Sequence, residues 1–188
     1  MKNTLLIFLV LLLFSSHSKV QNHSSSQYED NDTIIWSQNR KLIWNDFQGQ
    51  PDSNEMNKAS TFAGLELRSF YTQGSIPKLN VICYFIKSKS WVKVENENYL
   101  AHEQVHFDIW ELYARKIRKS FDSLSVNGNT NILDYYAIFN SYSEKCSNYH
   151  NLYDSKVYFN DVRQEEWIKK IPVELGKLKK YEVEINDD

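Results

Sequence analysis

The feature that most constrains the fold of this chain is a change of hydrophobic period near Asn96. Before it, Ala59 to Thr72 alternates between apolar and polar side chains, and Leu79 to Ile86 is apolar on both faces. After it, apolar residues recur at helical spacing from about Asn98 to Ser120, a stretch without glycine or proline. The alternation predicts a half-buried strand, the doubly apolar run a central strand, and the later spacing a helix. A sheet followed by helices indicates an α+β domain with an N-terminal antiparallel sheet.

Shorter patterns predict further elements on both sides of this change. Leu42 to Trp44 is a candidate for a short strand. The alternating segment Lys87 to Val94 either continues the central strand or forms an edge strand. Apolar spacing then predicts a second helix from about Ile132 to Tyr153.

A third helix is expected to begin at Asp161. The side chain of Asp161 can cap this helix, and Gln164 then occupies the capping-box position. Pro172 lies inside the apolar stripe of the same segment, so we expect a kink or a break there. The sequence therefore predicts strands first and three helices afterwards.

The first residues differ in composition from all that follows. Residues 1–18 combine an early Lys2, an unbroken apolar run from Leu5 to Phe14 and the small-residue segment Ser16-His17-Ser18, which is the pattern of a secretory signal peptide. The run is shorter than the ~20 apolar residues that span a bilayer, which argues against a membrane anchor. We therefore expect an exported protein, periplasmic or secreted, without a stable membrane span once the signal is removed.

The remaining composition indicates one domain. Residues 19–33 carry almost no apolar side chains and predict a polar linker, which leaves residues 34–183 for a single domain. With 22 basic and 24 acidic residues, and no basic stripe with interleaved aromatic side chains, the chain lacks the features of a nucleic-acid-binding protein. Cys83 and Cys146 can form one disulfide in an exported protein or remain two buried thiols, and the sequence leaves both possibilities open.

The first predicted helix contains the stretch LAHEQVHFDIW, Leu100 to Trp110, which includes the pattern H-E-x-x-H. His102 and His106 are four residues apart, so their side chains project from one face of a helix, about 40° apart. Two imidazoles placed in this way can bind one Zn²⁺ ion, and Glu103 is placed to act as a general base toward water. The alternative is a helix with two solvated or core-satisfied histidines.

A zinc site needs a third protein ligand, which this motif does not supply. The extended form of the motif, with a glycine and a third histidine shortly downstream, is absent because those positions hold Ile109 and Leu112. The ligand must therefore come from beyond the first helix. Spacing alone does not rank the candidates, which are Glu144, His150, Asp154 and Asp161.

Ordered blocks over much of the chain carry a resemblance that adds to this interpretation. The blocks are Arg40–Pro51, Lys89–Val92, His102–Ile109, Tyr153-Asp154 and Gln164–Trp167. Together they resemble a bacterial family of secreted proteases predicted to depend on zinc, domain of unknown function 922. The family's helix reads H-E-Q-G-H-F-D-I, and this chain has Val105 in place of the glycine.

The chain departs from the family pattern after Tyr153-Asp154. In the family, Thr-x-His-Gly follows, and its histidine is a natural third ligand. Here the segment reads YDSKVYFND, with Val157 or Phe159 in that place. Within the matching block Asp154 is then the expected third ligand, since a carboxylate oxygen can bind zinc.

The resemblance implies a zincin-like fold and a secreted zinc-dependent metallopeptidase that acts on peptides or proteins. Glu103 would be the catalytic base, and a tyrosine such as Tyr149, Tyr153 or Tyr158 could donate a hydrogen bond to the developing oxyanion. The missing histidine motivates an alternative, a non-catalytic exported domain of zincin-like fold that binds a partner. A structural envelope protein with a fortuitous motif is a third reading.

Overall fold

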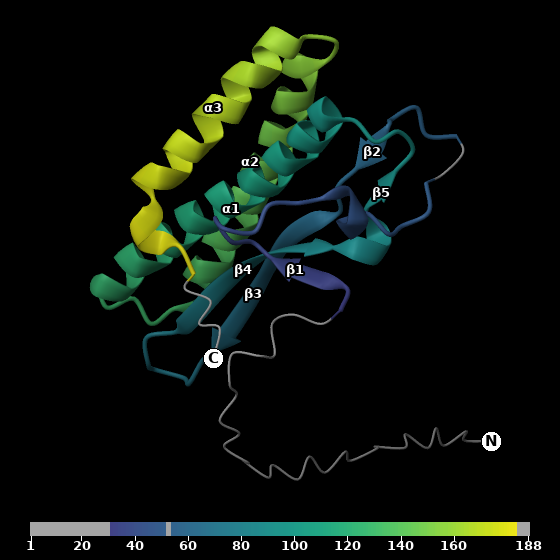
Figure 1. The fold of residues 1–188 in the computed structure, drawn as a ribbon. Coiled ribbons are helices and arrows are strands. Elements are labelled where there is room, and N and C mark those ends of the chain that lie inside the picture. The colour runs from purple at the N-terminus through teal and green to yellow at the C-terminus, as the bar shows by residue number, and fades with distance from the viewer. Residues whose placement is uncertain (1–30, 52–53, 184–188) are drawn as a thin grey trace, which may run out of the picture.

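The structure is a computed structural model that describes residues 31–51 and 54–183 (Figure 1). A three-stranded antiparallel sheet has the strand order β1-β4-β3, and a second antiparallel pair joins β2 to β5. The strands are β1 (Thr33–Ile35), β2 (Ala59–Ser60), β3 (Ala63–Phe70), β4 (Lys78–Ile86) and β5 (Trp91–Val92). The helices that follow are α1 (Glu97–Val126), α2 (Ile132–Val157) and α3 (Asp161–Lys177). The predicted α+β order, a small antiparallel sheet and then three helices, is confirmed.

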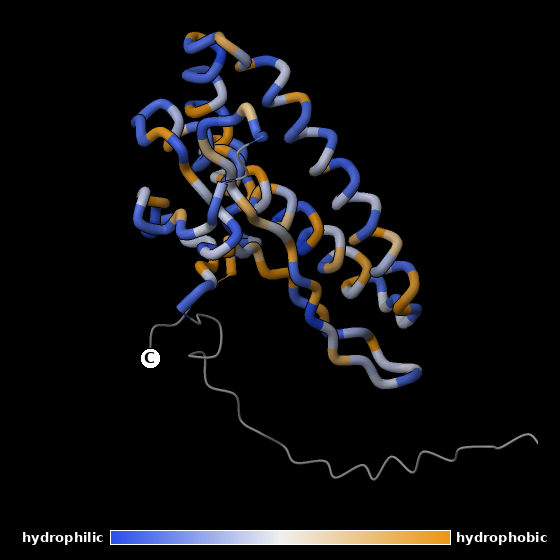
Figure 2. The backbone as a smooth tube through the Cα atoms, turned by 90° about the vertical axis from the view of Figure 1, so that its right-hand side faces the viewer, coloured by the Kyte–Doolittle hydropathy of each residue, from blue (hydrophilic) through white to orange (hydrophobic). Residues whose placement is uncertain are grey.

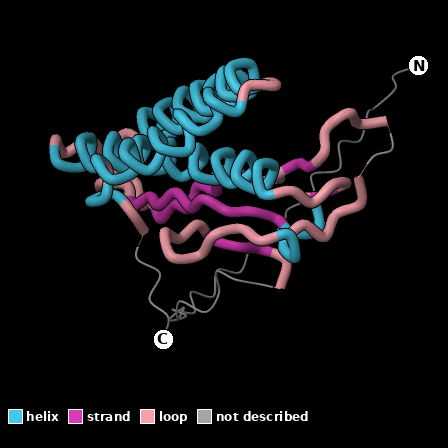
Figure 3. The backbone as a smooth tube through the Cα atoms, turned by 45° about the horizontal axis from the view of Figure 1, so that its top comes forward, coloured by secondary structure: helices cyan, strands magenta, loops and turns pink. Residues whose placement is uncertain are grey.

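Helix α1 lies between the sheet and the other two helices. It contacts β3 and β4 on one side and both α2 and α3 on the other, so the helices gather on one face of the sheet (Figures 1 and 3). Each helix begins at an asparagine whose side chain accepts a hydrogen bond from a first-turn amide. The three caps are Asn96, Asn131 and Asn160.

The core forms where the central strand meets α1. Val81, Cys83 and Phe85 alternate along β4 and are buried together with Phe107 and Ile117 of α1. Hydrophobic residues are interleaved with hydrophilic ones along the helices (Figure 2), as amphipathic helices require. β1 and β3 flank β4, and α1 covers one of its faces. The prediction that this doubly apolar segment is a central strand is therefore confirmed.

The two cysteines are free thiols. Both Cys83 and Cys146 are buried, and no disulfide joins them. Burial raises the pKa of both thiols above the usual value. They therefore act as small apolar core residues, the second of the two possibilities that the sequence left open.

The strand that we expected at Leu42 to Trp44 is absent, and this prediction is wrong. The backbone N–H of Leu42 donates to Gln104 Oε1 at 2.8 Å, and that of Ile43 donates to Asp46 Oδ2 at 2.8 Å. A 3₁₀ turn at Trp44–Asp46 follows. Side-chain acceptors here satisfy the amides that a strand would have paired with another strand.

The segment Lys87 to Val94 neither continues β4 nor pairs with the main sheet. A 3₁₀ turn at Lys87–Lys89 redirects the chain, and β5 then pairs with β2 to form the β2–β5 ribbon. Gly49 packs against this turn, and its backbone N–H donates to Ser90 O with an N to O distance of 2.7 Å. A Cβ at Gly49 would lie 2.8 Å from Ser88 O, so this close backbone approach requires glycine.

The start of α3 differs from the expectation in two details. Asn160, not Asp161, caps the helix, and Gln164 donates to Asn98 O at 2.7 Å instead of completing a capping box. This bond ties the start of α3 to the start of α1. The helix also continues through Pro172 to Lys177, so the break that we considered there does not occur.

A polar face of α1, which begins at Gln104, binds the segment from Trp36 to Leu42 through hydrogen bonds. Trp36 Nε1 donates to Asp108 Oδ1 at 2.7 Å, and Gln104 Nε2 donates to the same oxygen at 2.8 Å. At about 100° per residue, this face points roughly opposite to the face of His102. Gln104 and Asp108, which belong to the block His102–Ile109, thus have a structural role.

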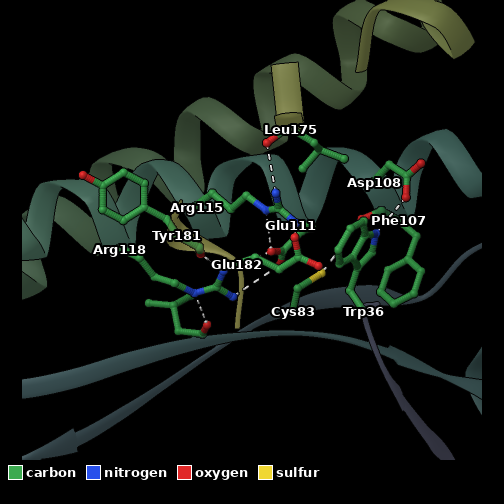
Figure 4. Close-up of polar contacts among 11 residues, drawn as sticks. Trp36, Cys83, Phe107, Asp108, Glu111, Arg115, Arg118, Leu175, Tyr181 and Glu182 are labelled. Atoms are coloured by element: carbon green, nitrogen blue, oxygen red, sulfur yellow. Dashed lines mark hydrogen bonds and ion pairs between the residues drawn. The ribbon is translucent and has the colours of Figure 1, made fainter. Parts of the chain in front are cut away.

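The same face continues into a buried ionic network, drawn in Figure 4. Glu111 accepts from Arg115 Nε at 2.9 Å and from Arg118 Nη1 at 3.0 Å. The two arginines also reach backbone carbonyls and one further carboxylate, at Val81, Leu175, Tyr181 and Glu182. The network therefore joins α1 to β4, to α3 and to the segment that follows α3.

The targeting predictions fall mostly outside the described residues. The expected signal peptide, residues 1–18, lies there entirely, and so does most of the linker, residues 19–33. Among residues 31–51 and 54–183, no helix combines the length and the apolar character needed to cross a membrane.

Candidate metal centre

Three of the predicted site residues lie together. His102 and His106 project from one face of α1, and Asp154 reaches them from α2. His106 Nε2 lies 3.0 Å from His102 Nε2 and 2.9 Å from Asp154 Oδ1. His102 Nε2 lies 3.5 Å from the same oxygen. Three atoms that all carry lone pairs therefore converge on one point.

This spacing fits a metal ion. A tetrahedral zinc ion with ligands at ~2.0–2.1 Å separates its ligand atoms by about 3.3 Å. The three observed separations of 2.9, 3.0 and 3.5 Å lie on both sides of that value. Two nitrogens and one carboxylate oxygen are also donor atoms that zinc accepts in proteins. The group His102, His106 and Asp154 could thus hold a metal ion without a large movement of either helix.

The charge states suit metal binding as well. Burial, and then the neighbouring His106, lower the pKa of His102 to about 4, so its imidazole is neutral near pH 7. Partial burial of Asp154 opposes its ionisation, but the hydrogen bond to His106 and the nearby imidazoles outweigh this, and the pKa of Asp154 falls below its usual range. A neutral imidazole and an ionised carboxylate are the forms that bind a metal.

The site is accessible from solvent on the side of α2. The side chain of Asp154 is 51% exposed, whereas those of His102 and His106 are 24% and 15% exposed. Solvent therefore reaches the carboxylate edge of this group. Three protein ligands, with the fourth position left open, are typical of catalytic zinc sites, whereas structural sites have four protein ligands.

Glu103 lies beside this group and is buried. Only 5% of its surface is exposed, and its burial raises the pKa of its carboxyl group. Glu103 follows His102 on the same helix turn, and its carboxyl group interacts electrostatically with His106 and Asp154. Thr61, which follows β2, hydrogen-bonds to Glu103 and covers it from the β2–β5 ribbon.

Tyr153 forms one wall of the site. Its ring stacks on His102, with centroids 4.8 Å apart, and meets the ring of His106 edge-on at 5.0 Å. Its hydroxyl is buried and has no hydrogen-bond partner among the described residues. Tyr153 is thus the closest to the imidazoles of the three tyrosines named from the sequence, whereas Tyr149 contacts Trp167 and Lys170, and Tyr158 is 74% exposed.

The other candidates for the third ligand lie elsewhere. His150 Nδ1 approaches His106 Nδ1 at 2.8 Å, on the side of that ring away from Asp154. Glu144 and Asp161 are exposed and do not belong to the group of possible ligands. Of the four candidates, the structure brings only Asp154 to Nε2 of both histidines.

Two neighbours of the site were not anticipated from the sequence. Gln164 hydrogen-bonds to His102, and Thr61 hydrogen-bonds to Glu103. Gln164 was expected to complete the cap of α3, and Thr61 lies inside a segment that was read only as a strand. Contacts between residues so far apart in sequence follow from how α3 and the β2–β5 ribbon pack on α1, which local patterns do not encode.

The lowered pKa values predict how the metal-free protein responds to acid. His102 and His150, with pKa values of about 4 and about 3, bind protons less readily when folded than at the usual value of 6.5. The unfolded chain therefore binds more protons below pH 6.5, and stability falls as the pH drops from 6.5 toward 4. We expect the two histidines together to contribute a loss on the order of 5 kcal/mol across this window.

The measurement is urea unfolding at several pH values in the presence of a chelator. A double variant, His102→Gln with His150→Gln, should lose less stability across the same window than the original protein. Glu103 has a raised pKa and acts in the opposite direction, so the informative quantity is the difference between the two proteins. Parallel pH profiles would show that the two histidines are not responsible.

No match was found in comparisons of the chain with protein-family models, curated proteins and solved structures. The geometry of this site and the residues around it are therefore the basis of the functional proposal.

Proposed function

We propose that this protein is a zinc-dependent hydrolase that cleaves peptide bonds. The observation that carries the proposal is the convergence of His102 Nε2, His106 Nε2 and Asp154 Oδ1 at the spacing of tetrahedral ligands. Glu103 stands next to this triangle on the same helix turn, which supplies the base that such chemistry needs.

Each residue then has a defined part in the reaction. When bound, a zinc ion supplies Lewis acidity, which lowers the pKa of water and polarises a carbonyl group. Glu103 accepts the proton of the attacking water and delivers it to the leaving amine. Its raised pKa suits both transfers, because a general base works best with a pKa near the working pH. Tyr153, with its unpartnered hydroxyl, is the candidate donor to the oxyanion.

The β2–β5 ribbon offers a place for an extended substrate. It lies beside α1, and Thr61 at the end of β2 hydrogen-bonds to Glu103. A peptide that adds to the ribbon as a further strand would pass close to the catalytic carboxylate. This arrangement favours a peptide or protein substrate over a small molecule.

The resemblance to the family of predicted secreted zinc-dependent proteases supports the same proposal. Tyr153-Asp154 and His102–Ile109, two of the blocks that carry it, meet at the site. A zincin-like classification and an exported location remain parts of the proposal, and the secretory pattern of residues 1–18 supports the exported location.

Replacing Glu103 with glutamine tests the proposal directly. The amide keeps the size of the side chain but cannot accept the proton, so we expect the rate of peptide hydrolysis to fall about 10²–10⁴-fold. The assay uses purified mature protein loaded with zinc and a mixture of unstructured peptides, with products identified by mass spectrometry. Zinc affinity should change little, because Glu103 is not one of the three ligands.

Glu97→Gln is the matched control, since Glu97 is an exposed glutamate in the first turn of the same helix. It should retain full activity. Equal rates of hydrolysis by the original protein and Glu103→Gln would exclude Glu103 as the base, and no hydrolysis by the original protein would overturn the proposed peptidase activity. A zinc-binding but inactive protein would then support the alternative, an exported domain that binds a partner.

A further inference from the structure

His150 is a polar side chain beside the candidate metal centre for which the proposed reaction has no use. It lies on α2, one turn before Asp154, and its ring faces that of His106 edge to edge, with centroids 5.1 Å apart and an interplanar angle of 26°. The ring of Trp110 covers it from α1, with centroids 4.8 Å apart. Its position is therefore defined by two aromatic contacts on the far side of His106 from Asp154.

The polar contact of His150 is with Nδ1 of His106, one of the three candidate metal ligands. His150 Nδ1 lies 2.8 Å from His106 Nδ1, while the opposite nitrogen of His106 faces His102 and Asp154. A histidine that binds a metal through Nε2 carries its proton on Nδ1, and that proton needs an acceptor. Among the described residues, His150 Nδ1 is the hydrogen-bond partner of His106 Nδ1.

We propose that His150 is the positioning residue of the metal centre, whose Nδ1 accepts the Nδ1–H of His106 and so aims the Nε2 lone pair at the ion. An acceptor for this proton fixes the tautomer and the orientation of the ligand ring, and it increases the basicity of the nitrogen that binds the metal. The inference rests on the metal site of the proposed function but not on catalysis.

The surroundings of His150 argue against a role in stability alone. Its second ring nitrogen, Nε2, is buried and has no hydrogen-bond partner among the described residues. A buried polar atom without a partner costs free energy, which an apolar side chain at this position would avoid. His150 therefore lowers the stability of the zinc-free fold, which favours a role for its Nδ1 contact with His106 at the metal centre.

Two substitutions of similar size separate these roles. Asparagine places its amide oxygen at the same number of bonds from Cβ as Nδ1 of histidine, so His150→Asn keeps an acceptor for His106. His150→Leu fills a similar volume without an acceptor. The zinc dissociation constant of each full-length mature protein is measured by competition with a chelator, and thermal melting of the zinc-free proteins is recorded in parallel.

The expected result has three parts. His150→Leu weakens zinc binding about 10–100-fold, as is typical when the partner of a metal-binding histidine is lost. His150→Asn restores most of that affinity. The zinc-free His150→Leu protein melts at the same temperature as the original protein or above it, because it loses an unpaired buried nitrogen.

Two results would overturn the inference alone: equal zinc affinity in the original protein and His150→Leu, or an asparagine variant as weak as the leucine variant. Failure of the original protein to bind zinc would overturn the metal centre itself, and the inference with it. Loss of hydrolysis in Glu103→Gln has no bearing on these affinities, so the two proposals fail separately.

Discussion

Replacing Glu111 with leucine should lower the free energy of unfolding by about 3–5 kcal/mol. Glu111 is 2% exposed and pairs with both Arg115 and Arg118 on the next turns of α1 (Figure 4). Arg115 is itself 2% exposed, so the substitution leaves a guanidinium group in the core with reduced compensation. Removing one partner of a buried ion pair costs far more than the pair contributes, because the other charge loses its partner without regaining water.

The comparison that isolates this effect uses a surface pair of the same chemistry. Glu66 pairs with Arg68 on β3 at 2.7 Å, but its side chain is 46% exposed. Glu66→Leu should cost less than about 1 kcal/mol, since water and salt already screen that pair. Urea unfolding monitored by tryptophan fluorescence measures both variants.

A triple variant provides the second check. Replacing Glu111, Arg115 and Arg118 together with apolar residues should destabilise the protein by less than the sum of the three single substitutions, because each single variant leaves the other members of the network without a partner. Equal costs for Glu111→Leu and Glu66→Leu would contradict this account of the network.

Much of the fold could be predicted because its signals are local. The doubly apolar run of β4 and the helical spacing that follows Asn96 follow directly from which faces are buried. The same geometry placed His102 and His106 on one face of α1, since four residues make slightly more than one turn. Predictions failed where side chains from distant segments replaced backbone partners, as at Leu42, whose amide donates to Gln104.

The third ligand shows where spacing stops being informative. His150 and Asp154 are also four residues apart, on the same face of α2. Which of them reaches Nε2 of His106 depends on how far α2 is shifted along α1, and that shift is set by tertiary packing, which residue spacing does not encode. The family resemblance pointed to Asp154, whereas periodicity did not separate it from His150.

Zinc should stabilise the protein strongly through this site. At a free zinc concentration 100 times the dissociation constant, binding adds about 2.7 kcal/mol to the free energy of unfolding. For a domain of this size, that corresponds to a rise of about 5–10 °C in melting temperature. His106→Ala and Asp154→Ala should each remove most of this gain, because each substitution deletes one of the three ligands.

The most direct test of the metal centre is a zinc titration of the mature protein and three variants, with bound metal counted by atomic absorption. We expect one ion for each original molecule, and the same for Glu144→Ala, which removes an exposed carboxylate from the same helix as Asp154. His106→Ala and Asp154→Ala should retain little or no zinc after dialysis. Full zinc binding by Asp154→Ala, or none by the original protein, would contradict the assignment of His102, His106 and Asp154 as the ligands.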